Sequence, residues 1–112
     1  VLPVVEAISQ RFDTIISVDT STPQVIRGAV QLGADLINDV RALSRLGALD
    51  AAVESGLPVC LMHMQGEPSS MQENPDYQNI FDEVAAFWAR CRLCCRGYIE
   101  GANIARSGFW IW

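Results

Sequence analysis

The segment at residues 14–23 places an apolar, β-branched run directly before a helix-start signal. Its apolar β-branched residues are Ile15, Ile16 and Val18. Such residues favour a strand that is buried on both faces, and Asp19 stands where that strand would end. Thr22 can accept a hydrogen bond from a free amide of the next helix, and Pro23 suits the first helical position. Because α/β folds place ligand-binding groups at strand ends beside helix starts, the segment predicts an α/β fold with a site near Asp19.

The same strand-then-helix unit recurs along the chain. Apolar spacing predicts helices at residues 1–11, 23–32 and 46–55 and from residue 77 onward, and strands at residues 14–19, 36–40 and 58–63. Gly33 and Gly56 follow two of these helices, at the position where a left-handed residue is favoured. The connections are long enough for parallel strands, so about three parallel strands with flanking helices are expected.

Length and charge limit the class of protein. The chain has 112 residues, which suits one small domain, and its formal charge of −5 argues against a nucleic-acid partner. No apolar run approaches the ~20 residues that a membrane-spanning helix needs. The cysteines do not follow a secreted disulfide framework, and they are Cys60, Cys91, Cys94 and Cys95. A reducing, cytoplasmic setting is therefore expected.

Polar and soft side chains gather where the three predicted strands end. They are Asp19, Asn38, Asp39, Met62 and His63. A carboxylate accepts hydrogen bonds and an amide both donates and accepts them, so Asp19 and Asn38 suit a flat nitrogen heterocycle such as a pterin or a purine. Met62 offers an apolar surface for such a ring. The alternative interpretation is structural: Asp19 caps the next helix and Asn38 ties down a turn.

Structural roles are expected for the other candidates. His63 is the single histidine, and without a nucleophile beside it a structural role is favoured. Cys91 and Cys94 form a C-x-x-C pair that lacks the further ligands of a four-coordinate zinc site, so no metal ligand is predicted. Three arginines are expected to be solvated surface charges, namely Arg27, Arg41 and Arg45.

Three motifs resemble the dihydropteroate synthase family. They read Ser-Val-Asp-Thr-Ser at residues 17–21, Ile-Asn-Asp-Val-Arg at 37–41 and Cys-Leu-Met-His-Met-Gln-Gly at 60–66, in the order and at about the spacing of that family. The resemblance covers about residues 1–89. It implies a (β/α)8 TIM barrel, of which this chain would hold strands three to five as an internal fragment.

The resemblance also implies a reaction. In that family p-aminobenzoate attacks the methylene of 6-hydroxymethyl-7,8-dihydropterin diphosphate, which gives dihydropteroate and diphosphate. The residues matching Asp19 and Asn38 hydrogen-bond the pterin, and those matching Val40 and Met62 line the same pocket. Mg²⁺ and the diphosphate are held largely by residues outside this stretch, and the intact family is homodimeric through late helices. No catalytic residue is assigned to this chain, and little or no activity is expected from it alone.

The tail departs from the resemblance after about residue 89. Permitted codons for residues 97–112, read one base later, spell GISKEQILLDPGFG, and the family continues with a DPGFGFG segment at about that distance. The hypothesis is a single-base shift between about residues 88 and 97. Residues 1–89 are then predicted to be a partial pterin-binding barrel segment, and residues 90–112 an out-of-frame tail.

Two alternative functions remain open. The first is the pterin-binding domain of a corrinoid methyltransferase, which shares the barrel and the pterin-binding Asp and Asn, although the Met-His-Met-Gln-Gly run favours the synthase. The second is a non-catalytic interaction or metal-binding module built on the cysteine cluster. Zinc titration would detect thiolate-dependent binding in that second case.

Overall fold

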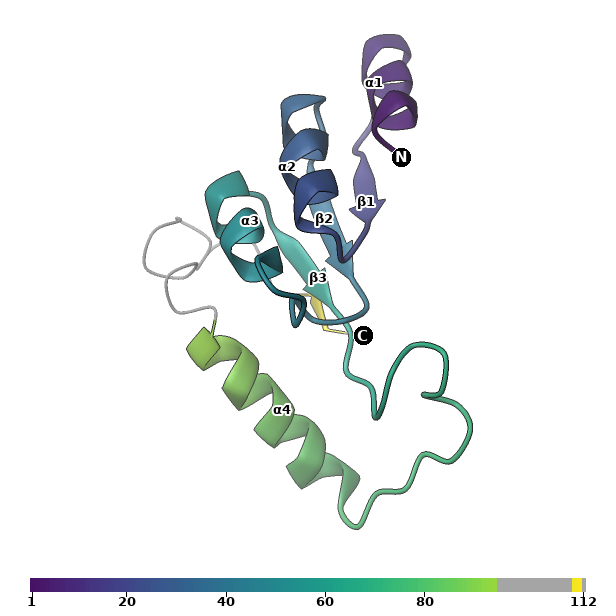
Figure 1. Cartoon of the computed structure of the whole chain (residues 1–112), viewed down its shortest axis with the longest axis vertical. Coiled ribbons are helices and arrows are strands. Elements are labelled where there is room, and N and C mark those ends of the chain that lie inside the picture. Colours follow the sequence, from purple (N-terminus) through teal and green to yellow (C-terminus); the bar gives the residue numbers. More distant parts are fainter. Residues whose placement is uncertain (95–109, 112) are drawn as a thin grey trace.

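Helices and strands alternate along the chain as the sequence predicts (Figure 1). The computed structural model describes residues 1–94, 110 and 111. Its helices are α1 (Leu2–Arg11), α2 (Pro23–Gln31), α3 (Ala48–Ser55) and α4 (Ile80–Cys94). Its strands are β1 (Ser17–Asp19), β2 (Leu36–Asp39), β3 (Val59–Leu61) and β4 (Trp110–Ile111). The expected α/β class with parallel strands and flanking helices is confirmed.

The strands form one parallel sheet in the order β1-β2-β3-β4. The first three are the predicted strands, each shorter than expected. The fourth was not predicted: it is a two-residue strand that pairs Trp110 with Cys60 and Ile111 with Leu61. This strand lies in the tail for which the sequence suggested no structural role.

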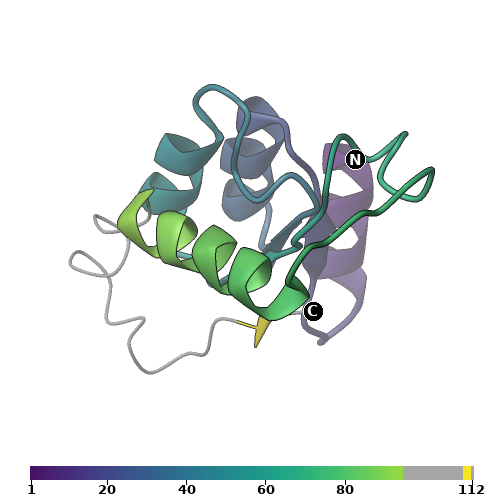
Figure 2. The same ribbon diagram turned by 90° about the horizontal axis from the view of Figure 1, so that it is seen from below.

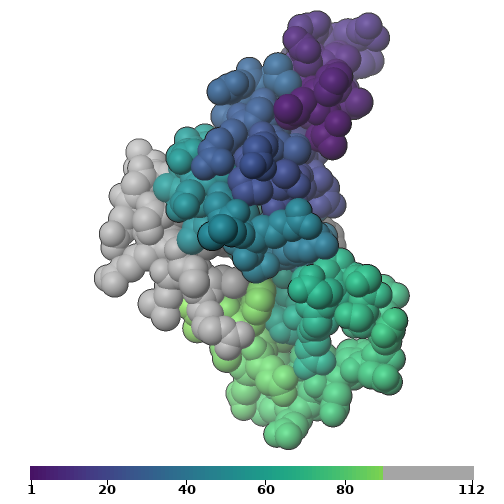
Figure 3. Space-filling view, in the orientation of Figure 1, coloured from purple at the N-terminus to yellow at the C-terminus, as the bar shows by residue number. Residues whose placement is uncertain are grey.

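One face of the sheet is sealed by helices. In Figure 1, α2 and α3 lie on the same side of the strands, and the two helices pack against each other. The strands contribute Val18, Ile37, Val59 and Leu61 to the core. The helices contribute Ile26 and four alanines, whose small side chains let the backbones approach closely. These alanines are Ala29, Ala48, Ala51 and Ala52. Figure 3 shows α1 at one end of the elongated molecule and α4 at the other.

The long connection between β3 and α4 is tied at its two ends. The Gln65 amide donates to the Asp76 carbonyl at 2.6 Å and accepts from the Asp76 N–H at 2.9 Å. At the start of α4, the Glu83 carboxylate accepts from the backbone N–H groups of Gln78 and Asn79 at 3.0 and 3.3 Å. Figure 2 shows this connection and α4 running along one side of the molecule. Paired side-chain bonds thus give the polar loop a defined path.

Two local predictions at the first strand are wrong. Ile15 is 82% exposed, because it precedes β1 at the edge of the sheet, where the described residues include no covering element. Thr22 is the N-cap residue of α2, but its side chain makes no capping hydrogen bond. Instead Thr20 Oγ1 accepts a hydrogen bond from the Thr22 N–H at 3.1 Å. The turn after β1 is therefore closed by Thr20, two positions before the N-cap residue.

The predicted glycine helix ends are confirmed. Gly33 follows α2 with φ of +95°, and Gly56 follows α3 with φ of +64°. After α2, the Ala34 N–H donates back to the Ala29 carbonyl at 3.0 Å. Such left-handed residues cost little only for glycine, which explains the abrupt helix ends.

Candidate functional site

Strand register brings three side chains into one row across the sheet. Asp19 pairs with Asn38, and Asn38 pairs with Cys60. Side chains alternate between the two faces of a strand, so this row points away from the face that the helices seal. A carboxylate, a carboxamide and a thiol thus lie side by side on the open face.

A cavity of about 340 Å³ lies on that open face, and we call it the niche. Its lining residues are Ser17, Leu36, Asn38, Val40, Cys60, Leu61 and Met62. Three of the four predicted pterin contacts, Asn38, Val40 and Met62, therefore share one cavity. The fourth, Asp19, does not line the niche, but it is the register partner of Asn38 on the neighbouring strand. The structure thus brings three of the four predicted residues into one cavity and places Asp19 beside Asn38, and the role of all four toward a ligand stays a prediction.

Cys60 belongs to the niche and was not predicted there. Its side chain is buried, and burial raises the pKa of the Cys60 thiol, with the Asp19 carboxylate adding to the rise. The thiol is therefore neutral at neutral pH, and the charge of Asp19 lies close enough to affect it. The signal in the sequence was the spacing of two between Cys60 and Met62, which puts both on one face of a strand.

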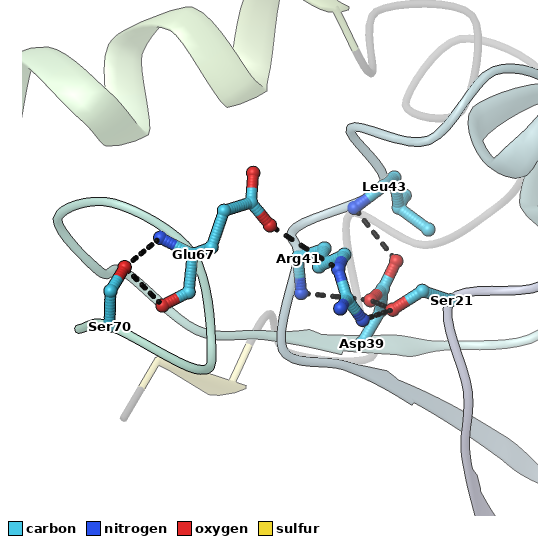
Figure 4. A network of polar contacts seen from close by, with 6 residues as sticks. All are labelled: Ser21, Asp39, Arg41, Leu43, Glu67 and Ser70. Carbon is cyan, nitrogen blue, oxygen red and sulfur yellow. Dashed lines mark hydrogen bonds and ion pairs between the residues drawn. The ribbon is translucent and has the colours of Figure 1, made fainter.

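Asp39 does not belong to the niche, in contrast to the expectation that it would lie with Asp19 and Asn38. It is fully buried and points to the other face of the sheet from its neighbour Asn38. Its Oδ1 accepts from the Ser21 hydroxyl at 2.5 Å and from the Arg41 N–H at 2.9 Å (Figure 4). Its Oδ2 accepts from the Leu43 N–H at 2.9 Å. All of these bonds are internal, so Asp39 is unavailable to a ligand.

His63 packs among aromatic rings. Its ring meets Phe87 edge-to-face with centroids 4.8 Å apart, and Tyr77 lies at 6.0 Å. This packing fixes the start of the β3–α4 connection against α4 and supports the structural interpretation of the histidine.

Two of the three arginines make ion pairs. Arg27 on α2 donates to Glu54 on α3 at 2.7 Å, which raises the pKa of the arginine and lowers the pKa of Glu54. Arg41 lies 3.7 Å from the Glu67 carboxylate and donates to Ser21 at 3.4 Å. Both arginines thus link neighbouring elements at the surface.

The described residues do not fit a resident metal ion. Within the described part of the chain, no group of three or more His, Cys, Asp or Glu side chains could hold one. The side chains of Cys91, Cys94 and Cys95 lie outside the described residues, so the cysteine-cluster alternative stays untested. None of the described helices is long and apolar enough to cross a membrane.

The chain forms a parallel sheet with an open niche on one face and helices on the other, and comparison with known proteins identifies the class of protein. The chain belongs to the family described as "Pterin binding enzyme", whose sequence model matches residues 1–99. Within that family the chain is similar to dihydropteroate synthase: the enzyme of Escherichia coli K12 is 60% identical over 107 residues. The expected resemblance is confirmed.

Solved structures agree with this assignment. A Yersinia pestis dihydropteroate synthase crystallised with a sulfonamide drug complex superposes with a TM-score of 0.83 at 49% identity over 88% of this chain. A Xanthomonas albilineans dihydropteroate synthase in complex with 7,8-dihydropteroate gives a TM-score of 0.74 at 38% identity, again over 88% of this chain. The chain covers 36% and 35% of those two structures, and it aligns over 96% of its own length with 36% of the E. coli enzyme. It spans about a third of the length of the relatives it matches.

Proposed function

We propose that this chain forms part of the pterin-binding wall of a dihydropteroate synthase. The observation that carries the proposal is the row of Asp19 and Asn38 beside a niche that Val40 and Met62 also border. The cavity volume lies within the range of small-molecule sites, and its walls are mainly apolar with a few polar groups. The identity to synthases favours this function over the pterin domain of a corrinoid methyltransferase.

Each side chain has a role in the proposed complex. The Asp19 carboxylate accepts hydrogen bonds from N–H groups on the edge of the pterin, and the Asn38 carboxamide donates to and accepts from ring atoms. Val40 and Met62 pack against the ring. Replacing water at a flat heterocycle with fixed partners gives orientation as well as affinity.

The substrates of the intact enzyme are proposed to be 6-hydroxymethyl-7,8-dihydropterin diphosphate and p-aminobenzoate. Binding the pterin would orient its methylene for attack by the amine, with diphosphate as the leaving group. Magnesium and the diphosphate would be held by residues outside this chain. Residues outside this chain would also form the contacts of a homodimer. We therefore propose that the 112 residues alone bind pterin weakly and turn over little or no substrate. The intact enzyme is proposed to act in the cytoplasm.

Ligand titration of the full chain tests this proposal. We expect pterin-6-carboxylate to bind wild-type protein, and Asp19→Asn to weaken binding by about 10-fold or more, as expected for loss of a charge-assisted bond. Asp13→Asn is the matched control, since Asp13 is an exposed carboxylate just before β1. Equal affinity in both variants would refute the role of Asp19. Dihydropteroate formation at the rate of a full-length synthase would refute the proposed inactivity.

We further propose that residues 90–112 are an out-of-frame tail and residues 1–89 the barrel segment. The codon argument supports this division, whereas the family match runs ten residues past the proposed boundary, to residue 99. Sequencing the gene across this segment decides the matter. Codons that cannot yield the GISKEQILLDPGFG translation one base later would end the proposal.

A further inference from the structure

Asp39 lies between two residues of the niche. Asn38 and Val40 both line the cavity, and Asp39 points to the opposite side of the sheet. Its carboxylate accepts three hydrogen bonds, so the backbone on either side of it cannot rotate without breaking at least one of them. Whatever fixes Asp39 therefore also fixes the directions in which Asn38 and Val40 point.

The same carboxylate reaches the neighbouring strand. Ser21 comes two residues after Asp19, is buried, and donates to Asp39 across 18 positions of sequence. This bond joins the end of β1 to the end of β2, where the Thr20 N–H also donates to the Asn38 carbonyl at 2.9 Å. Asp19 and Asn38 are thus held as a pair by contacts made just behind them.

The loop after Asp39 needs this anchor. Ala42 and Leu43 both have positive φ, at 50° and 60°, which is unfavourable for residues with a side chain. The Leu43 N–H is held by Asp39, and the Ala42 N–H donates to the Asp39 carbonyl at 3.0 Å. A left-handed pair persists only where its surroundings over-determine it, and Asp39 supplies two of the bonds that do so here.

We propose that Asp39 is a positioning residue for the pterin site: through Ser21 and the amides of Arg41 and Leu43, it sets the spacing and orientation of Asp19 and Asn38. Arg41 extends the arrangement toward a third loop, since its guanidinium contacts both Ser21 and Glu67 (Figure 4). Glu67 is largely exposed, so that contact contributes less than the buried bonds. The inference rests on the proposed function.

The first test measures pterin-6-carboxylate affinity in the full chain at a temperature where every variant is folded. Ser21→Ala removes the bond between the strand ends and keeps both backbone bonds to Asp39, and we expect binding about 5- to 10-fold weaker. Ser21→Thr restores the hydroxyl and should recover most of the affinity. Ser44→Ala is the matched control, because Ser44 is exposed in the loop after β2.

Asp39→Asn is the stronger variant, because a carboxamide cannot accept on both sides as the carboxylate does. We expect it to weaken pterin binding by more than 10-fold. Thermal unfolding of the same samples separates the two roles. A purely structural Asp39 would lower the midpoint temperature and leave the affinity of folded protein unchanged, and that result would overturn the inference.

A second readout needs no pterin. Cys60 is the third member of the row, and its burial should make it slow to react with iodoacetamide. If Ser21 and Asp39 hold the row, Ser21→Ala should increase the rate of Cys60 alkylation by about threefold or more. Peptide mass spectrometry measures this rate. Equal rates in Ser21→Ala and Ser44→Ala would overturn the positioning role. Failure of wild-type protein to bind pterin would instead count against the proposed function, while the alkylation rates would still decide this inference.

Discussion

The two faces of the sheet carry residues of opposite character at adjacent positions. Val18, Ile37 and Val59 are buried beneath the helices, whereas their sequence neighbours Asp19, Asn38 and Cys60 form the row at the niche. A single peptide bond therefore joins each core residue to a residue of the row. Residues that stabilise the fold and residues proposed to bind the ligand therefore alternate along the same strands, so single substitutions should separate stability from binding.

The largest expected effect is on the sealed face. Ile37 is fully buried in the centre of the core, so Ile37→Ala should lower the free energy of unfolding by about 2–5 kcal/mol. Urea unfolding followed by circular dichroism measures the change. Leu36→Ala, one residue away on the open face, is the control and should cost distinctly less. Equal losses of stability would show that both faces are packed alike and would contradict the proposed difference between them.

The next effect belongs to the open face. Asn38→Ala removes a carboxamide from the niche and should weaken pterin binding by about 10-fold, which corresponds to the loss of one hydrogen-bonded pair. Its free energy of unfolding should change by less than about 1 kcal/mol, since the side chain is only half-buried. Calorimetric titration and urea unfolding of the same preparation test both halves. A stability loss as large as that of Ile37→Ala would contradict the division between the faces.

A smaller effect is expected at the helix ends on the sealed side. Gly56→Ala introduces a side chain at positive φ in open space, so only the backbone cost of about 1 kcal/mol applies. Gly33→Ala should cost more, because its new Cβ would lie 3.2 Å from the Ser9 Cβ. Thermal unfolding ranks the two variants. Neither should change the pterin affinity of the folded protein, and a change in affinity would show that the helix layer influences the niche.

The smallest effect concerns the surface ion pair between Arg27 and Glu54. The arginine lowers the pKa of Glu54 from its ordinary value of 4.5, so the folded state favours the charged carboxylate. The stabilisation is present above that value and is lost as the pH falls through the lowered pKa. Glu54→Gln should therefore unfold at a slightly lower temperature than wild type at pH 7, and the difference should shrink as the pH is lowered toward 3. Unfolding temperatures that differ more at pH 3 than at pH 7 would contradict this sign.

Much of the fold could be predicted because its signals are local. Apolar spacing gave the order of helices and strands, and Gly33 and Gly56 mark helix ends through the φ angles that they alone tolerate easily. The exposure of Ile15 could not be predicted, because it depends on which element lies beside β1 rather than on the residue itself. β4 could not be predicted either, since its partner strand is about 50 residues earlier in the chain.

The candidate site was predicted in part. The three sequence motifs marked Asn38, Val40 and Met62, which share the niche, and Asp19 beside them. The sequence prediction groups Asp39 with them because it also lies at the strand end, although alternation along a strand puts adjacent residues on opposite faces. Its direction is fixed by tertiary bonds to Ser21 and to the loop that follows. Cys60 is missed because a thiol in an apolar run has no chemical pattern of its own, and only its spacing of two from Met62 indicates the shared face.

The alternation within β2 limits how this segment can change over time. Point substitutions alter one face at a time, so the residues that line the niche and the residues of the core beneath it can evolve independently. Loss or gain of a single codon between Leu36 and Val40 would instead exchange the two faces, turning Asp39 outward and Asn38 into the apolar layer. Insertions and deletions should therefore be confined to the connections, while β2 keeps a constant length.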